Sequence, residues 1–330
     1  MLKVSGKVLL LALLSLLTTA QPAFSAPLVN WRFPFRLPIP VPLRIVERFR
    51  EQRVPMKPEP QMVELSGLRW HADYNSAWRQ AKAEQKMLFV LFDSAKPNAH
   101  RQAVLDLIAK NADVAKKLKS SFVLASIPMD QTILAGGKRT KLITHGSMHE
   151  LHGYQGLAIV DLKNQGKPYY GYVVSSYPFM NGKYYRFRAA DLPVIVDLPP
   201  GTITQRTMVW AVRVHPERPA STGGKASSVL IQAAESHSHY QAQIGVQGHH
   251  HWETRFHHLI GKLSGSHAPV EVVAESWPNQ SMIDSCVDCV ASWRHSEGHW
   301  NAVRSPQDIY GYDIKRGNNG IWYGTGIFGR

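Results

Sequence analysis

A chain of 330 residues, 44% of them hydrophobic, is long enough for about two domains that each bury a hydrophobic core. This composition excludes an intrinsically disordered chain, and a content of two cysteines excludes a disulfide-rich scaffold. The net charge of +14 favours an anionic partner, and the N-terminal sequence narrows the classes of partner to consider.

The first 26 residues have the features of a secretory signal peptide. Lys3 and Lys7 precede the apolar run of residues 8–17, and Ala23-Phe24-Ser25-Ala26 ends in the small-x-small pattern of a cleavage site. A short membrane anchor is the alternative interpretation. Either one predicts an exported protein that works in the periplasm, at the cell surface or in the extracellular medium.

Cleavage after Ala26 would remove two lysines and no acidic residue, so the mature charge would be 14 − 2 = +12. A basic charge suits nucleic acid, but export disfavours that partner. We therefore expect an anionic envelope polymer, a lipid surface or a polysaccharide as the partner.

Residues 27–60 form a Pro/Arg-rich linker with eight prolines and seven Lys or Arg residues. Proline lacks a backbone donor and restricts the residue before it, so this segment cannot continue as a helix. It is predicted to be a stiff, extended spacer.

Helices and buried strands alternate over residues 61–203. A helix is predicted over residues 74–85, with Tyr74, Ala77, Trp78 and Ala81 on one face. The apolar run MLFVLF at residues 87–92 predicts a strand that is buried on both faces. The alternation indicates a three-layer α/β unit. The further predicted elements are helices over 101–110 and 112–118 and strands over 122–127, 157–161 and 171–174.

Three segments, WHADYNSAWRQAKAEQKMLFVLFD, FVLASIPMD and GYQGLAIVDLKNQGKPYYGYV, resemble a thioredoxin-like domain. That family runs helix, strand, active-site loop, helix and strand, and then a proline-led strand followed by its partner. Its redox cysteines should follow the first strand, where this chain has residues 93–99 (DSAKPNA). Its loop proline should precede Leu157, where this chain has Gly156. The resemblance thus implies a redox-inactive α/β/α sandwich that serves as a scaffold or docks a protein partner.

Residues 204–330 are predicted to form a second domain, after a boundary rich in proline and glycine at residues 191–206. The run MVWAVRV predicts a strand over residues 208–214. The helix predicted over residues 227–243 has on one side Leu230, Ala233, Ala234, His237 and Gln241. The remaining predicted elements are a loop over 216–225, a helix over 281–294 and a strand hairpin that turns at Asn318-Asn319-Gly320.

Histidines and carboxylates concentrate in this second part, because 11 of the 16 histidines lie after residue 200. They occur in three stretches, residues 248–251 (GHHH), 271–275 (EVVAE) and 293–300 (WRHSEGHW). Imidazoles and carboxylates that a fold brings together make either a metal site or an acid/base site.

The order of elements from Ser227 onward resembles the CAP superfamily, which includes cysteine-rich secretory proteins and plant pathogenesis-related proteins. Residues 271–274 are similar to the family's Glu-Asn-Ile-Ala segment, and a helix that ends in a tryptophan is followed by Ser296-Glu297-Gly298-His299. Glycine-rich aromatic strands over residues 310–328 complete the resemblance. It implies a CAP-like α-β-α sandwich, so the chain is expected to be a two-domain α/β protein.

The CAP resemblance also implies a cleft that is lined by two histidines and two acidic residues and that binds a divalent metal in some members. Zn²⁺ or a similar ion suits such a ligand set. The second acidic position falls on Ser296 here, so the set is incomplete. The candidates are one of His249, His250 and His251, with spacing in favour of the first two, then Glu271 or its rival Glu275, the adjacent Glu297, and His299. The other histidines are expected on helix surfaces or in loops, namely His237, His239, His257, His258, His267 and His295.

Cys286 and Cys289 lie three residues apart on the helix predicted over residues 281–294. A thiolate near a helix start is stabilised by the helix dipole, which makes the pair a candidate redox site. The pair also lies inside the apolar pattern of Ile283, Val287 and Val290, which favours two buried free thiols.

The incomplete ligand set and the lack of an evident nucleophile favour a binding or interaction role over catalysis. The expected ligand of the His/Glu cleft is a divalent metal, an amphiphile or a polysaccharide. The alternative is a metal-assisted hydrolase that acts on peptide or glycan, with His299 as a ligand, Glu271 as the base and water as the nucleophile.

Overall fold

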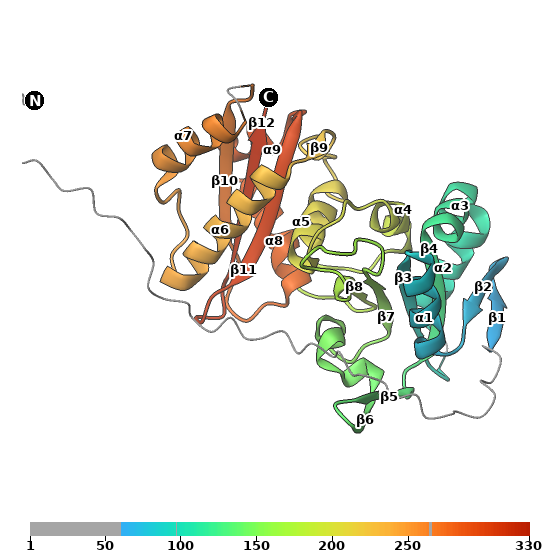
Figure 1. Cartoon of the computed structure of the whole chain (residues 1–330). Helices are drawn as coiled ribbons and strands as arrows, with labels where there is room; N and C mark the ends of the chain where they lie inside the picture. The colour runs from blue at the N-terminus through green and yellow to red at the C-terminus, as the bar shows by residue number, and fades with distance from the viewer. Residues whose placement is uncertain (1–60, 97, 264–265) are drawn as a thin grey trace, which may run out of the picture. The chain divides into compact units, whose positions relative to one another are not determined.

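The structure is a computed structural model that describes residues 61–96, 98–263 and 266–330, and all of them belong to one compact unit. The predicted signal peptide and linker lie outside the described residues. Figure 1 shows two main sheets with helices around them, and this mixed arrangement confirms the predicted α/β class. None of the helices in the described ranges is both long and apolar enough to cross a bilayer.

The first half of the described chain is built on a six-stranded mixed sheet in the order β1-β2-β4-β3-β7-β8. Strand β4 is parallel to β2 and β3, and the other neighbours are antiparallel. The central strand β3 pairs with β4 along its whole length and with β7 on its other side, so its apolar run is buried as predicted. The strands are β1 (Met62–Leu65), β2 (Leu68–His71), β3 (Met87–Asp93), β4 (Phe122–Pro128), β7 (Gly156–Val160) and β8 (Val173–Pro178).

Helices cover both faces of this sheet. Helix α1 buries Tyr74, Ala77 and Ala81 against one face, and Trp78 packs beside them, which confirms the predicted helical face. Side chains of α2 and α3 join the core on the opposite face. The elements are α1 (Tyr74–Glu84), α2 (Ala99–Lys110), α3 (Ala112–Ser121) and α4 (Leu192–Val196), the 3₁₀ turns η1 (Leu142–Thr144), η2 (Gly146–Leu151) and η3 (Ala189–Asp191), and the separate hairpin of β5 (Thr132–Ala135) and β6 (Lys138–Lys141).

Gly156 stands where the thioredoxin resemblance implies a loop proline, and the backbone packs tightly around it. A Cβ atom at this position would lie 2.5 Å from the carbonyl oxygen of Tyr177 and 2.7 Å from the side chain of Leu151. Because real Cβ atoms do not approach a carbonyl so closely, the contact between β7 and its neighbours requires glycine.

The second half is built on a four-stranded sheet in the order β10-β12-β11-β9. The hairpin predicted around Asn318-Asn319-Gly320 is confirmed, since β11 and β12 pair in antiparallel register across that turn. Helix α6 packs on one face of the sheet with α7 beside it, and α8 packs on the other. The elements are β9 (Lys225–Ala226), β10 (Pro269–Glu275), β11 (Ile309–Arg316) and β12 (Trp322–Gly329), with the helices α6 (Ser228–Ile244), α7 (Trp252–Lys262), α8 (Met282–Arg294) and α9 (Glu297–Arg304).

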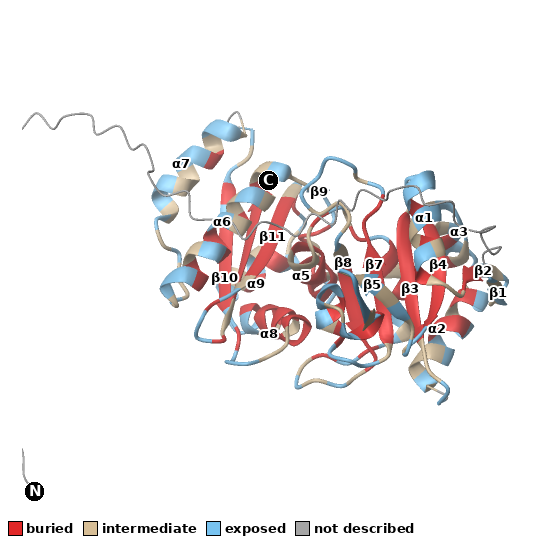
Figure 2. Cartoon of the chain, turned by 60° about the horizontal axis from the view of Figure 1, so that its bottom comes forward, coloured by how far each residue is buried: buried red, intermediate tan, exposed pale blue. Residues whose placement is uncertain are grey.

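The strand predicted over residues 208–214 is wrong, because these residues belong to helix α5 (Ile203–Arg213). Thr202 and Gln205 form a reciprocal capping box that satisfies the free N–H groups of the first turn. The helix is buried on nearly all sides, as Figure 2 shows, and its second half is the apolar run MVWAV at residues 208–212, with no polar residue within it. A continuous apolar run fits a buried strand and a buried helix equally well.

Helix α5 connects the two sheets through one hydrophobic cluster. It contacts β8 of the six-stranded sheet and both β11 and α8 of the second half. Buried side chains of both halves belong to the same cluster, among them Phe89, Tyr177, Trp210, Trp293 and Tyr312. The predicted division between residues 203 and 204 falls at the first turn of this helix.

Candidate functional site

Five side chains from different elements meet at one edge of the four-stranded sheet. Strand β10 is the edge strand, and α7 and α9 both contact it. We call this group the histidine cluster; it consists of His237 on α6, His249 in the following loop, Arg255 on α7, Glu271 on β10 and His299 on α9.

Glu271 lies at the centre of the histidine cluster, and its side chain is only 1% exposed. One carboxylate oxygen, Oε1, accepts from Nδ1 of His249 at 3.0 Å and lies 3.7 Å from Nε2 of His237. The other oxygen is ion-paired with the Arg255 guanidinium. A buried carboxylate needs such partners, because burial without them would cost several kcal/mol.

The ring of His249 is held at one nitrogen and open at the other. Its Nδ1–H donates to the carboxylate, so in the neutral ring Nε2 keeps a lone pair. Nε2 lies 3.2 Å from Nε2 of His299. Two imidazole nitrogens at this separation share either a proton or a cation, because two lone pairs with nothing between them would repel each other.

Burial lowers the pKa of His299, and the neighbouring His249 lowers it further against the opposing effect of Glu271. His299 is therefore neutral over most of the physiological pH range. Its ring centroid lies 5.4 Å from that of His249, and the His249 side chain is 44% exposed. His299 thus offers a neutral nitrogen ligand beside Nε2 of His249, at a position that solvent reaches.

His237 is buried with an exposed fraction of 2%, so its predicted place on a helix surface is wrong. Its Nδ1 accepts from Arg255 at 2.9 Å, and its Nε2 donates to the carbonyl oxygen of Gly248 at 2.9 Å. Burial lowers the pKa of His237 to about 4, and the adjacent Arg255 contributes to the decrease. A proton on Nδ1 would face the guanidinium, which explains why the neutral ring is preferred.

The loop that carries His249 is fixed by the end of α6. Gly245 ends the helix in the left-handed conformation with a φ of 69°. Gln241 then accepts from the Gly248 N–H at 3.1 Å and donates to Thr325 of β12 at 3.0 Å. These contacts hold the loop against the sheet and direct His249 toward β10.

The other predicted candidates lie outside the histidine cluster. His250 is next to it, but its Nε2 interacts with the carbonyl oxygen of Val246 at 3.3 Å, and His251 interacts with Tyr240. Glu275 is exposed and four residues further along β10 than Glu271, which is about 13 Å in an extended strand. Glu297 is exposed in the first turn of α9. Glu271 therefore occupies the central position for which the sequence left two candidates.

Sequence reasoning missed Arg255 and misjudged His237. The signal for His237 was available, because the predicted inward side of the helix over residues 227–243 included it. Arg255 lies on α7, for which no element was predicted. Its charge balances that of Glu271.

Cys286 and Cys289 are both free and buried, in agreement with the interpretation as buried thiols. Burial raises the pKa of both thiols well above the usual range. A protonated, buried thiol is a poor nucleophile.

The described residues contain no group of three or more His, Cys, Asp or Glu side chains arranged to hold a metal ion. The arrangement that remains is the two-nitrogen pair of His249 and His299, with a carboxylate behind one of them. Comparison with known proteins adds nothing to this geometry, because no family model, no curated protein and no solved structure matches the chain.

Proposed function

We propose that the protein has a binding role and that its ligand site is the pair of His249 and His299, which hold a divalent cation such as Zn²⁺. The observation that carries the proposal is the 3.2 Å separation of the two Nε2 atoms. Zinc–nitrogen bonds of about 2.0–2.1 Å in tetrahedral geometry place two ligand nitrogens about 3.3 Å apart. The donor set therefore fits the ion.

Glu271 supports this site from behind rather than as a ligand. A histidine that binds a metal commonly donates its other N–H to a carboxylate, which fixes the tautomer and raises the basicity of the ligand. Glu271 and Nδ1 of His249 have this relation at 3.0 Å. Arg255 occupies the second carboxylate oxygen and so keeps the carboxylate in place.

Two protein nitrogens leave further coordination positions for a ligand, and a bound cation would attract an anionic group of that ligand. The net charge of +14 favours the same class of partner. We therefore propose an anionic envelope polymer, polysaccharide or lipid as the partner of an exported, CAP-like protein. Nucleic acid is not part of this proposal, because export separates the protein from it.

The first half would serve as a thioredoxin-like scaffold without redox activity, or as a docking module for a protein partner. The order α1, β3, loop, α2, β4 and then the antiparallel pair of β7 and β8 supports this likeness. The loop between β3 and α2 has no cysteine, and an ion pair of Asp93 at the end of β3 with Arg101 of α2, at 3.0 Å, connects its two sides.

The alternative is a metal-assisted hydrolase of peptide or glycan, and the orientation of His249 favours it. An imidazole whose Nδ1–H donates to a buried carboxylate is positioned as a general base at Nε2. In this alternative Nε2 of His249 is the base in place of Glu271, because both oxygens of that carboxylate are engaged, and His299 is the metal ligand.

Metal content tests the proposal. After incubation with zinc and removal of the excess, we expect about one bound ion per chain, as a tetrahedral site predicts. We expect the His299→Ala variant to lose it. The matched control is His257→Ala, an exposed histidine on α7 that should leave the content unchanged. A wild-type protein that binds no zinc, or a His299→Ala variant that binds as much, would contradict the proposal.

Hydrolysis of isolated envelope polymers separates the two candidates. A binding protein releases no product, whereas a hydrolase releases product that disappears in His249→Ala and in His299→Ala. Activity that persists in both variants would count against the alternative as well.

A further inference from the structure

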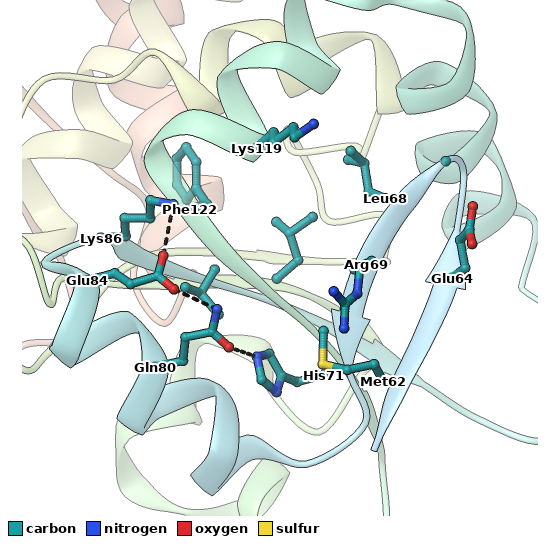
Figure 3. A pocket seen from close by; sticks show the side chains of 13 residues that line it. Met62, Glu64, Leu68, Arg69, His71, Gln80, Glu84, Lys86, Lys119 and Phe122 are labelled. Atoms are coloured by element: carbon teal, nitrogen blue, oxygen red, sulfur yellow. Dashed lines mark hydrogen bonds and ion pairs between the residues drawn. The ribbon is translucent and has the colours of Figure 1, made fainter. Parts of the chain in front are cut away.

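A cavity of about 710 Å³ lies in the first half of the protein, far along the chain from the histidine cluster. Figure 3 shows it between strand β2 and strand β4, with α1 and the end of α3 around it. Its volume is in the range of sites for small organic ligands, about 300–1,000 Å³.

The cavity exists because the two neighbouring strands diverge. Strand β2 pairs with β4 at a single position, His71 with Ala125, although β3 pairs with all seven residues of β4 on the other side. Phe122, Val123 and Leu124 consequently have no strand partner on the β2 side among the described residues. Successive residues of a strand point to opposite faces, so a cavity lined by all three runs along the edge of the strand.

A chain of hydrogen bonds forms one wall of the cavity and fixes the state of His71. Lys86 pairs with Glu84 at 2.9 Å, and the Gln80 amide nitrogen donates to Glu84 at 2.7 Å. The amide oxygen of Gln80 is therefore the atom that faces Nε2 of His71 at 2.6 Å. An amide oxygen only accepts, so Nε2 carries the proton, and in the neutral ring Nδ1 is an acceptor.

Among the described residues, Nδ1 of His71 has no hydrogen-bond partner, although the residue is only 2% exposed. A buried acceptor without a partner costs about 1–3 kcal/mol, and buried polar atoms of native proteins are nearly always satisfied. Nδ1 has almost no accessible surface, so the contacts open to a molecule in the cavity are the other polar groups of the lining and not this nitrogen.

Two cations at the cavity are free of carboxylates. Arg69 on β2 and Lys119 on α3 form no ion pair with any described residue. Arg69 lies opposite Glu64 in the register of β1 and β2, yet the two are not ion-paired. The apolar part of the lining comes from Leu68, Phe122 and Leu124.

We propose that this cavity binds a small amphiphilic anion, which is a carboxylate or sulfonate on an apolar body. Arg69 and Lys119 bind the anionic group, and the apolar body lies against Leu68, Phe122 and Leu124. This site is independent of the histidine cluster and of the function proposed for it.

Anilinonaphthalene sulfonate is a suitable probe, because it combines a sulfonate and an aromatic body. We expect a saturable rise in its fluorescence with one site per chain, and displacement by dodecanoate. Loss of two charge-assisted contacts in the double variant Arg69→Gln/Lys119→Gln should weaken binding about tenfold or more. Lys116→Gln, an exposed lysine on the same helix α3, should bind as the wild type does.

A second variant keeps the test specific. Leu68→Trp should obstruct the cavity and weaken binding while far-ultraviolet circular dichroism stays unchanged. Unsaturable binding, equal affinity in the double variant, or unchanged affinity in Leu68→Trp would overturn the proposal.

Discussion

His71 and His237 are equally buried, at 2% exposure each, but their ring nitrogens differ in hydrogen-bond partners between the two halves of the protein. His237 beside the four-stranded sheet has a partner at each ring nitrogen. His71 beside the six-stranded sheet has a partner at Nε2 and none at Nδ1 among the described residues. The comparison teaches that burial alone does not show whether a histidine is fully hydrogen-bonded. The partners of each ring nitrogen have to be identified.

Of the substitutions considered, removal of the Glu271 carboxylate should lower the free energy of unfolding most, because Glu271 lies at the centre of the histidine cluster. Glu271→Ala leaves the Arg255 guanidinium, which is 20% exposed, without its carboxylate, and it removes the acceptor of His249. Loss of one partner from a buried ion pair costs about 3–5 kcal/mol, and the partial exposure of Arg255 places this case near the lower limit. Urea unfolding measures the change. Glu275→Ala, an exposed carboxylate on the same strand, should alter stability by less than about 0.5 kcal/mol. Similar losses in both variants would contradict the network.

Acid should lower the stability of the protein through His237 of the histidine cluster. Its pKa is about 4 in the folded protein, below the usual 6.5, so the folded state favours the neutral ring. The stabilisation is complete above pH 6.5 and is lost as the pH falls from 6.5 toward 4, because the unfolded chain binds the proton first. We expect a loss on the order of 2 kcal/mol over that interval.

His237→Gln isolates this contribution, because a glutamine amide can still donate to the Gly248 carbonyl oxygen but does not titrate. Urea midpoints measured from pH 7 to pH 4 should fall less steeply in the variant than in the wild type. Parallel curves would show that His237 does not carry the acid sensitivity.

Gln80→Ala should reduce stability less than Glu271→Ala or the protonation of His237. The cavity beside Gln80 is already open to solvent on one side. The substitution leaves Nε2 of His71 without its acceptor, and the expected cost is about 1 kcal/mol. Arg79→Ala is the control, since Arg79 is exposed on the same helix and its side chain hydrogen-bonds, among the described residues, to Ser76 alone. Thermal unfolding distinguishes them, and an equal midpoint for both variants would show that the wall of the cavity is not ordered by Gln80.

Much of the first half could be predicted because the local sequence pattern of its strands and helices indicates each element. The run MLFVLF is apolar on both faces and becomes the central strand β3, and the spacing of Tyr74, Ala77 and Ala81 becomes the buried face of α1. The run MVWAVRV has the same apolar character but belongs to α5, whose capping box of Thr202 and Gln205 starts the helix before the run. This cause lies outside the run itself.

The site could be predicted only in part, for a related reason. Periodicity placed His237 on the same side of α6 as its apolar residues. Its partner Arg255 lies on α7, a helix of mostly exposed residues that was not predicted from the sequence. The choice between Glu271 and Glu275 depends on how far β10 extends past the loop of His249, which is tertiary information. The divergence of β2 from β4 leaves no trace in the sequence, because it is a property of pairing and not of composition.

Arg206 fixes helix α5 to the first half. Its guanidinium is buried and donates to the carbonyl oxygens of Val174, Leu198 and Pro199 and to the hydroxyl of Ser175. A protease that cleaves the turn after α5 would therefore leave this helix on the N-terminal fragment. Contacts of α5 with β11 and α8 cross the cut, and Asp284 of α8 accepts the N–H groups of Tyr184 and Tyr185 across it. Neither fragment would be released, and the nicked protein would migrate as one particle until denatured.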